Sequence, residues 1–513
     1  MSTSSIQVIL PFLIVVATGM VALLWDAFLL PAGRKSALVW ISFIGIAAGI
    51  VSLHSIWGRD LDGFNGTVTG DGFALLFQFI ILIVTLLGIL LSEQYIQQKN
   101  INFGEYYALI LFSASGAMLM SAARELILIF IGLEILSIAL YVLSGFARTE
   151  EKSEEAAIKY FLLGAFSSGF FLYGIALFYG GTGTTILANV PTLAQSAASS
   201  SAFSLSSPYT VAGIAFILVG LCFKAAIVPF HSWTPDVYQG APTSVTAYMS
   251  AGAKAGAFAA LIRVLTVVLP VSQVWRDVLW ILAAATMIVG NVVALWQRDI
   301  KRMLAYSSIA QAGYILVGVL AANQDGRAAV LFYMLVYTFM NLGAFGVILL
   351  LARTGQDRTR MSDLQGLGRS HPFAATLMTI FLFSLAGVPP AAGFLGKFYI
   401  FQAAIEAHLI GLVTVLALSS VVGVFYYIYV IARMWFMPAE VEVGHLSWSP
   451  WTNVALGVCA GATLLLFLIP GPIVTTFSAA SNSLAAPQEA ARAVPAQSFS
   501  PVVRSIFQEA AAK

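Results

Sequence analysis

The sequence has very little charge and almost no cysteine. Only 9% of its 513 residues are Asp, Glu, Lys or Arg, whereas soluble chains carry about 25%. Its two cysteines, Cys222 and Cys459, lie inside apolar runs, so they cannot make an iron–sulfur site and we do not expect a disulfide. No basic cluster suggests nucleic acid, and no glycine-rich loop has the spacing that cradles a phosphate. These absences exclude most soluble classes of protein.

Apolar residues make up 59% of the chain and occur in long continuous runs. Runs of about 20 residues predict an all-α polytopic membrane protein, because a β-barrel would show short alternating segments instead. The first run lacks a positively charged leader, so we expect it to be retained. We predict about fourteen spans. They lie near 6–29, 37–56, 72–92, 105–122, 125–147, 156–180, 209–235, 242–269, 274–296, 302–322, 327–352, 373–403, 408–435 and 451–475.

Lys and Arg are distributed unequally between the two sets of loops, which predicts orientation. One set carries Arg34, Lys35, Lys99, Arg148, Lys152, Arg298, Lys301, Arg302, Arg353, Arg358, Arg360, Arg369 and Arg433. The other carries Arg59, Arg124, Arg276 and Arg327, with Arg492, Arg504 and Lys513 in the tail. We therefore expect the first set to face the cytoplasm and both termini to lie outside. On the outer side we also expect an uncharged loop at 182–207 and a polar, poorly ordered tail from about 478.

Four charges interrupt these apolar runs. Lys224, Lys254 and Lys397 lie deep in the seventh, eighth and twelfth predicted spans, and Glu134 lies in the fifth. A charge at the centre of a membrane helix costs roughly 3 kcal/mol or more, so each is a functional candidate by default. A lysine near a span end usually extends its ammonium to the surface instead, and Lys159 fits this simpler interpretation equally well.

Two of these spans also contain helix-breaking prolines. Pro229 removes the hydrogen bond to the carbonyl of Ala225, next to Lys224. Pro389 and Pro390 free the carbonyls of Leu385 and Ala386, shortly before Lys397. Interrupted helices at corresponding positions of two halves indicate the ion site of a transporter.

The order of the spans predicts an internal repeat. Spans four to eight and nine to thirteen each contain one broken helix, and a repeat of five helices is inverted because five is odd. We therefore divide the chain into an N-terminal three-helix segment at 1–104, a first repeat at 105–269, a second at 270–435, and a last helix with the polar tail at 436–513.

The buried charges suggest a proton relay. Burial favours the neutral form of a lysine, whereas a nearby carboxylate favours the charged form, so a Glu134–Lys224 pair could hold and release a proton. Lys254 then needs water or a carboxylate as its partner, and His231 is a possible bridge. A structural ion pair at Glu134 and an ordinary capped loop at His231 are the simpler alternatives.

Two stretches resemble a known family. FKAAIVPFHSWTPDVYQGAPTSVTAYMSAGAKAGAFAALIR and AGVPPAAGFLGKFYIF resemble the antiporter-like membrane subunits of respiratory complex I, which are similar to subunits of multi-subunit cation/proton antiporters. The resemblance covers about spans four to thirteen. It implies about fourteen helices, two inverted five-helix repeats, broken helices seven and twelve, and a half-membrane ion channel in each repeat.

The resemblance also implies roles for particular residues. It assigns Glu134, Lys224, Lys254 and Lys397 to the proton-relay positions of helices five, seven, eight and twelve, and Lys159 to a lysine of helix six. Lysine at 397 and the short polar tail are typical of the N-type subunits of this family.

The implied function is proton translocation by a bacterial inner-membrane subunit of NADH-quinone oxidoreductase. It would hold no cofactor, while FMN, iron–sulfur clusters and quinone would bind partner subunits, and further antiporter-like subunits would be its neighbours. Two alternatives stay open at this point: a subunit of a multi-subunit cation/proton antiporter, and a scaffold that completes a membrane arm. A sodium site needs several oxygen ligands, and Glu134 is the only deep carboxylate, which weighs against the antiporter.

Overall fold

The computed structural model describes residues 3–29, 35–190, 207–269, 273–352, 357–440 and 444–484, and most of these are helical. The helices are α1 Thr3–Leu29, α2 Ser36–Ser55, α3 Gly72–Gln98, α4 Gly104–Ala122, α5 Leu126–Ser144, α6 Glu151–Thr182, α8 Pro208–Ala225, α9 Trp233–Gly240, α10 Thr243–Val268, α11 Gln273–Ala294, α12 Ile300–Ala321, α13 Gln324–Leu350, α14 Leu367–Ser370, α15 Pro372–Ala386, α16 Ala392–Glu406, α17 Ile410–Phe436, α18 Pro450–Leu468 and α19 Gly471–Ser481. Two short strands, β1 Leu61–Gly63 and β2 Val68–Gly70, form an antiparallel hairpin. Most of the loop predicted at 182–207 and the tail beyond residue 484 lie outside the described residues.

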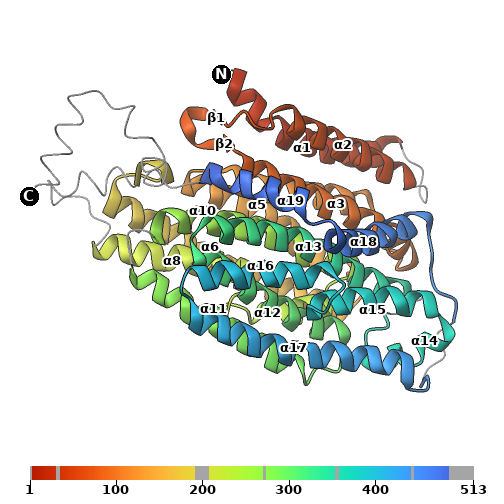
Figure 1. Ribbon diagram of the computed structural model, residues 1–513. Coiled ribbons are helices and arrows are strands. Elements are labelled where there is room, and N and C mark those ends of the chain that lie inside the picture. The colour runs from red at the N-terminus through yellow and green to blue at the C-terminus, as the bar shows by residue number, and fades with distance from the viewer. Residues whose placement is uncertain are drawn as a thin grey trace, which may run out of the picture.

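The long helices run side by side in one bundle (Figure 1). In this view α1 and α2 lie along one edge of the bundle and α17 along the other. Many helices begin at a polar residue whose side chain accepts a hydrogen bond from the backbone amide three residues on, which satisfies one otherwise unpaired N–H. These capping residues are Asp71, Ser207, Asp299, Asn323 and Ser449.

The described part of the chain contains twelve helices that are long and apolar enough to span a membrane. They correspond to all of the predicted spans except the fourth and the twelfth. The fourth is the less apolar α4, and the twelfth is divided between two 15-residue helices, α15 and α16. A polytopic all-α membrane protein is therefore confirmed, while the count of fourteen spans stays a prediction.

Three helices form the centre of the bundle. α10, α12 and α13 are buried along almost their whole length, whereas only about a third of the residues in the apolar stretches of α1, α6 and α18 are buried. α13 packs against α3, α10, α15, α16 and α18, which brings the two halves of the chain into contact. A helix that is apolar on all sides is buried in protein or faces lipid, and both kinds occur here.

The two ends of the bundle differ in charge. We call the end that carries Lys99, Lys152, Arg298, Arg360 and Arg433 the basic end. At the opposite end, only Ala123, Arg124 and Glu125 join α4 to α5. This turn pairs with the hairpin, through a bridge between Val68 and Ala123 and a hydrogen bond from the Arg124 amide to the Thr67 carbonyl.

Candidate functional site

Lys224 lies in the last turn of α8, just before the predicted break. The helix ends at Ala225, and Ala226 adopts a left-handed conformation with φ of 61°. The buried ammonium of Lys224 donates to the hydroxyl of Tyr160 on α6 over 2.8 Å, and it lies 5.5 Å from the centre of the Tyr141 ring. The carbonyl end of a helix and the faces of aromatic rings both stabilise a cation.

A second break with the same backbone pattern divides the twelfth predicted span. α15 ends at Ala386, and Gly387 adopts a left-handed conformation with φ of 81°. Its amide bonds to the carbonyl of Ser384 three residues back, as the amide of Ala226 bonds to that of Phe223. A cis proline follows each turn, at Pro229 and at Pro390. Both predicted helix breaks are therefore present.

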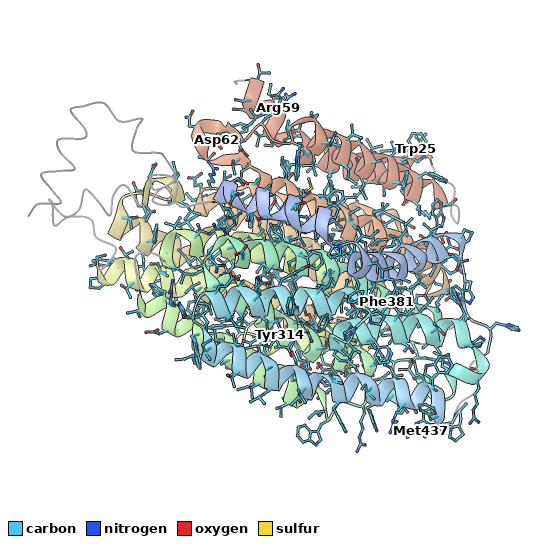
Figure 2. All side chains as sticks on the ribbon, in the orientation of Figure 1. Trp25, Arg59, Asp62, Tyr314, Phe381 and Met437 are labelled. Carbon is cyan, nitrogen blue, oxygen red and sulfur yellow. The ribbon has the colours of Figure 1, made fainter. Side chains whose placement is uncertain are left out.

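Lys397 bridges the second break. It lies in α16, and its ammonium donates to the carbonyl oxygens of Leu385 over 3.1 Å and Ala386 over 2.9 Å, at the end of α15. These are the two carbonyls that the prolines were predicted to free. The lysine also lies 4.9 Å from the centre of the Tyr314 ring, which Figure 2 labels in the interior of the bundle. Lys224 thus precedes its break, whereas Lys397 follows its own.

Lys254 has different partners from those that the sequence suggested. Its ammonium donates to the carbonyl of Ser308 on α12 and, over 2.6 Å, to the hydroxyl of the same serine. Tyr337 on α13 donates to that hydroxyl over 2.8 Å. In the described part of the chain, no carboxylate lies within ion-pair distance of Lys254. Its protein partner is therefore a serine, where the sequence suggested water or a carboxylate.

Polar residues of α12 lie between the acceptors of Lys254 and Lys397. Next to Ser308, Ser307 shares a hydrogen bond with Tyr427 of α17. One turn later, the buried amide of Gln311 donates to Tyr427 over 3.2 Å and to the carbonyl of Leu385 over 3.1 Å. Sequence reasoning missed Ser307, Ser308 and Gln311, although polar residues at helical spacing inside the apolar run were the available signal.

Glu134 is half-buried on α5 and does not pair directly with Lys224. Its carboxylate accepts a hydrogen bond from Ser168 of α6. No ion pair joins Glu134 and Lys224 among the described residues, so the direct pair that the sequence suggested is not formed here. Ile131 and Ile138, one turn before and after Glu134, are exposed, so this face of α5 also forms part of the outer surface of the chain.

Lys159 and His231 form no hydrogen bond with the three buried lysines in the part of the chain that the structure describes. Lys159 is 41% exposed and forms ion pairs with Glu155 over 2.6 Å and with Asp236 of α9 over 2.8 Å. Asp236 also accepts from Arg302 of α12 over 2.6 Å, so these contacts form a network near the basic end. His231 is half-buried in the turn between α8 and α9, and no hydrogen bond joins it to Lys224, Lys254 or Lys397 in the structure.

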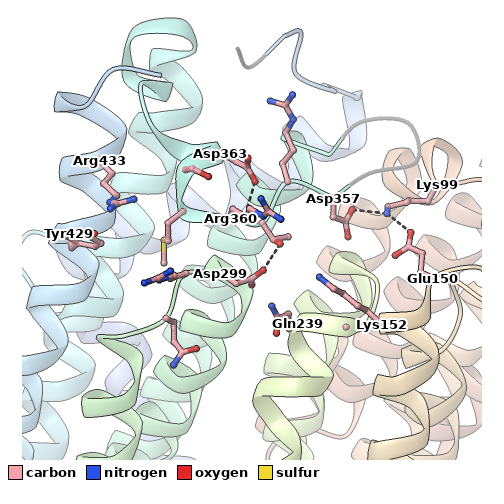
Figure 3. Close-up of a pocket in the computed structure, with 17 residues that line it drawn as sticks. Lys99, Glu150, Lys152, Gln239, Asp299, Asp357, Arg360, Asp363, Tyr429 and Arg433 are labelled. Carbon is pink, nitrogen blue, oxygen red and sulfur yellow. Dashed lines mark hydrogen bonds and ion pairs between the residues drawn. The ribbon is translucent and has the colours of Figure 1, made fainter. Parts of the chain in front are cut away.

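A polar cavity of about 1120 Å³ opens at the basic end (Figure 3). Lys99 lies at its wall between two carboxylates, 2.6 Å from Glu150 and 3.2 Å from Asp357. Burial alone lowers the pKa of Lys99, but the two carboxylates raise it more, so the net shift is upward and the ammonium stays charged. Asp357 also accepts from the Tyr95 hydroxyl over 2.9 Å and from Thr243 at the start of α10 over 3.2 Å. A residue of the cavity wall therefore contacts the first turn of the helix that carries Lys254.

Clusters of three or more His, Cys, Asp or Glu side chains that could hold a metal ion do not occur among the described residues. The candidate site consists of three separate polar clusters around Lys224, Lys254 and Lys397, and Glu134 binds Ser168 apart from them.

Residues 123–423 match the sequence pattern of the family described as "NADH:quinone oxidoreductase/Mrp antiporter, TM". The chain belongs to this family. The matched range includes Glu134, Lys159, Lys224, Lys254 and Lys397.

Relatives within the family cover nearly the whole chain. NADH-quinone oxidoreductase subunit N of Trichlorobacter lovleyi is 47% identical over 472 residues, which are 92% of this chain and 96% of that protein. A chain of respiratory complex I from Thermus thermophilus is 34% identical, with a TM-score of 0.77 over 91% of this chain and 98% of that one. A chain of the Mrp complex from Dietzia sp. shares the fold, with a TM-score of 0.81 and 21% identity over 96% of this chain and all of that one. The resemblance seen in the sequence is therefore confirmed, and relatives named subunit N match nearly the whole chain.

Proposed function

We propose that this chain is a proton-translocating membrane-arm subunit of a bacterial NADH-quinone oxidoreductase. The observation that carries the proposal is the set of three buried lysines, each with only neutral hydrogen-bond partners, in a chain that aligns along nearly its full length with subunits N. A buried ammonium without a carboxylate partner releases its proton more easily than a paired one, which suits a carrier that must pass protons on.

The relay runs laterally from Glu134 through Lys224 and Lys254 to Lys397. The hydrogen bonds of α12 support its last step, because Ser308 contacts Lys254 while Gln311 contacts the Leu385 carbonyl that also binds Lys397. Glu134 exchanges its bond with Ser168 for an interaction with Lys224 when the site rearranges. We assign Lys159 and His231 to the outer parts of the proton path. Water would have to carry protons between them and the buried lysines.

The chain is divided as its sequence suggests, into segments 1–104, 105–269, 270–435 and 436–513. The two breaks support an inverted repeat, since a left-handed residue ends the first part of the broken helix in both halves. The basic end faces the cytoplasm by the distribution of Lys and Arg, which places both termini outside in the bacterial inner membrane.

The redox chemistry belongs to other subunits of the enzyme. FMN, iron–sulfur clusters and quinone bind there, and this chain contributes as a translocase without a cofactor of its own. Its partners are the other membrane-arm subunits, including further antiporter-like chains. The exposed apolar faces of α6, α11 and α17 offer surfaces for these neighbours and for lipid.

The decisive experiment substitutes Lys254 by Ala in the assembled enzyme in proteoliposomes. We expect electron transfer from NADH to quinone to be lowered or uncoupled and proton pumping to be largely lost, while the subunit composition stays complete. Normal pumping by the complete complex would rule out a central role for Lys254. Substituting Lys152, an exposed lysine at the basic end, serves as a matched control and should leave pumping unchanged.

A cation/proton antiporter subunit is the second candidate, because the Dietzia Mrp chain has the same fold. Sodium-dependent proton exchange by the purified complex without any quinone reduction would favour it. Proton pumping that depends on NADH and is independent of sodium would favour the first candidate.

A further inference from the structure

The half of α10 between the basic end and Lys254 is lined with polar side chains. Thr243 at the start of the helix contacts Asp357 at the cavity, and Ser244 accepts from Tyr106 over 2.8 Å. Tyr248 donates to Ser113 of α4 over 3.1 Å. The polar residues of this half are Thr243, Ser244, Thr246, Tyr248 and Ser250. Lys254 thus has polar neighbours in the direction of the cavity.

The half of α10 beyond Lys254 contains no polar side chain for eight residues. The segment 255–262 reads AGAFAALI, and every residue in it is buried. A Cβ atom placed on Gly256 would lie only 2.9 Å from the Cβ of Ala117, so the backbones of α4 and α10 are in close contact. Such packing leaves no room for a water molecule along this face.

Arg263 follows this apolar segment and is buried with its side chain only 3% exposed. It lies about 13 Å beyond Lys254 along the helix axis. Its guanidinium donates to both carboxylate oxygens of Asp71 at the start of α3, over 3.0 and 2.8 Å, and its Nε donates to the carbonyl of Ser121 over 2.6 Å. All three nitrogens are therefore bound, and the cation is fixed in place.

A second layer closes this end of α10 toward the surface. Arg124, in the turn between α4 and α5, donates to Asp71 over 3.3 Å and to Asp62 of the hairpin over 3.0 Å. Phe73 lies against the guanidinium of Arg263, with its ring centre 5.1 Å away. The simple interpretation is a clamp that holds α3, α4 and α10 together. However, a buried ion pair is weak evidence of stabilisation, because desolvation offsets much of its attraction.

We propose that the apolar segment 255–262 and the Asp71–Arg263 pair form a barrier that prevents protons from leaving Lys254 through the end of α10 opposite the cavity. This inference rests on the proposed proton relay, and it assigns Arg263 a positioning role in the direction of transport. The packed segment excludes water, and the Arg263 guanidinium, which has no acceptor and whose three nitrogens are all bound, cannot pass a proton along this route. Protons on Lys254 then leave toward Lys397 or return toward the cavity.

The test measures passive proton permeability of proteoliposomes that contain the assembled enzyme, without NADH. The double variant Asp71→Asn with Arg263→Gln removes both charges together. The asparagine that it places at position 71 can still cap α3. We expect the variant vesicles to lose an imposed pH gradient several-fold faster than native ones. The matched control, Asp26→Asn with Lys35→Gln, removes a largely buried ion pair at α1 and α2 that does not contact the barrier, and it should leave the permeability unchanged.

Adding Lys254→Ala to the double variant separates a specific leak from general loosening. We expect this substitution to restore the slow loss of the gradient, because the leak passes through Lys254. A leak that persists without Lys254, a leak of equal size in the control, or no leak in a fully assembled double variant would each overturn the barrier. None of these results depends on pumping, so failure of the barrier is distinguishable from failure of the relay, which Lys254→Ala alone tests.

Discussion

The side-chain amide of Gln311 donates a hydrogen bond to the main-chain carbonyl of Leu385 over 3.1 Å. The same carbonyl accepts from Lys397, so a neutral residue of α12 and a charged residue of α16 share one acceptor at the helix break. The hydroxyl of Tyr333 donates to the amide oxygen of Gln311, which leaves this side chain fully engaged. Gln311 is therefore placed to control how strongly the broken helix holds the ammonium of Lys397.

Substituting Gln311 by Leu should slow proton pumping while leaving assembly intact. The change removes hydrogen bonds to Leu385, Tyr427 and Tyr333, and the loss of about 1.4 kcal/mol in the limiting step would reduce the rate roughly tenfold. The measurement is the initial rate of NADH-driven acidification in proteoliposomes. Gln402→Leu is the control, because Gln402 is exposed on α16 and contacts only Glu406. Equal rates in native and Gln311→Leu enzyme would contradict this role.

Tyr160 and Tyr141 offer a matched pair of substitutions at Lys224. Tyr160→Phe removes the hydroxyl that accepts a hydrogen bond from Lys224. Tyr141→Phe keeps the ring that Lys224 faces and removes a hydroxyl to which Lys224 does not donate. We expect Tyr160→Phe to reduce pumping about tenfold, because losing a hydrogen bond to a charged group costs at least about 1.4 kcal/mol. Tyr141→Phe should have little effect. Similar rates in the two variants would show that the Tyr160 hydroxyl is not needed.

Asp357 should contribute more to stability than Glu150, although both are ion-pair partners of Lys99. Asp357 also accepts hydrogen bonds from Tyr95 and Thr243, whereas Glu150 is more exposed, at 37%. Asp357→Asn should cost roughly 1.5–3 kcal/mol, the value of hydrogen bonds to a charged group. Thermal unfolding of the purified complex would show a lower midpoint for Asp357→Asn than for Glu150→Gln. Equal midpoints would contradict the ranking.

The Asp71–Arg263 pair should make stability depend on acidity. Burial raises the pKa of Asp71, but the Arg263 guanidinium, the Ala74 amide and the Arg124 guanidinium together lower it more, so the net pKa lies below its usual value. A carboxyl with a lowered pKa stabilises the fold above the unfolded pKa of about 3.9, and this contribution is lost as the pH falls toward the lowered value. The native complex should therefore lose stability more steeply below about pH 4 than the Asp71→Asn, Arg263→Gln variant. Parallel unfolding midpoints across this range would count against the pair.

The sequence allowed the helices and the breaks to be predicted because their signals are local. Long apolar runs define spans, and the prolines at 229, 389 and 390 identified both interruptions and even the carbonyls that bind Lys397. The exact division of the twelfth span into α15 and α16 depends on a turn in which the amide of Gly387 bonds back to the carbonyls of the last turn of α15. The sequence does not show where these hydrogen bonds form.

The partners of the buried charges could not be predicted, because they come from helices far apart in the sequence. Lys254 binds Ser308 rather than a carboxylate, and Glu134 binds Ser168 rather than Lys224. A charged residue inside an apolar run is easily recognised in the sequence as unusual, because it costs free energy there. A serine or glutamine among small residues is not recognised in this way. The Asp71–Arg263 pair escaped notice because each residue lies near the end of its helix, where charges are expected.

The ammonium of Lys397 belongs to one half-helix and its acceptors belong to the other, and this couples protonation to mechanical movement. A proton on Lys397 tightens the joint between α15 and α16, because the charged group binds the two carbonyls more strongly than the neutral amine does. By thermodynamic reciprocity, any force that pulls the half-helices apart weakens the hold on that proton. A displacement transmitted along the membrane arm could then be converted into proton release at this joint without any redox group nearby.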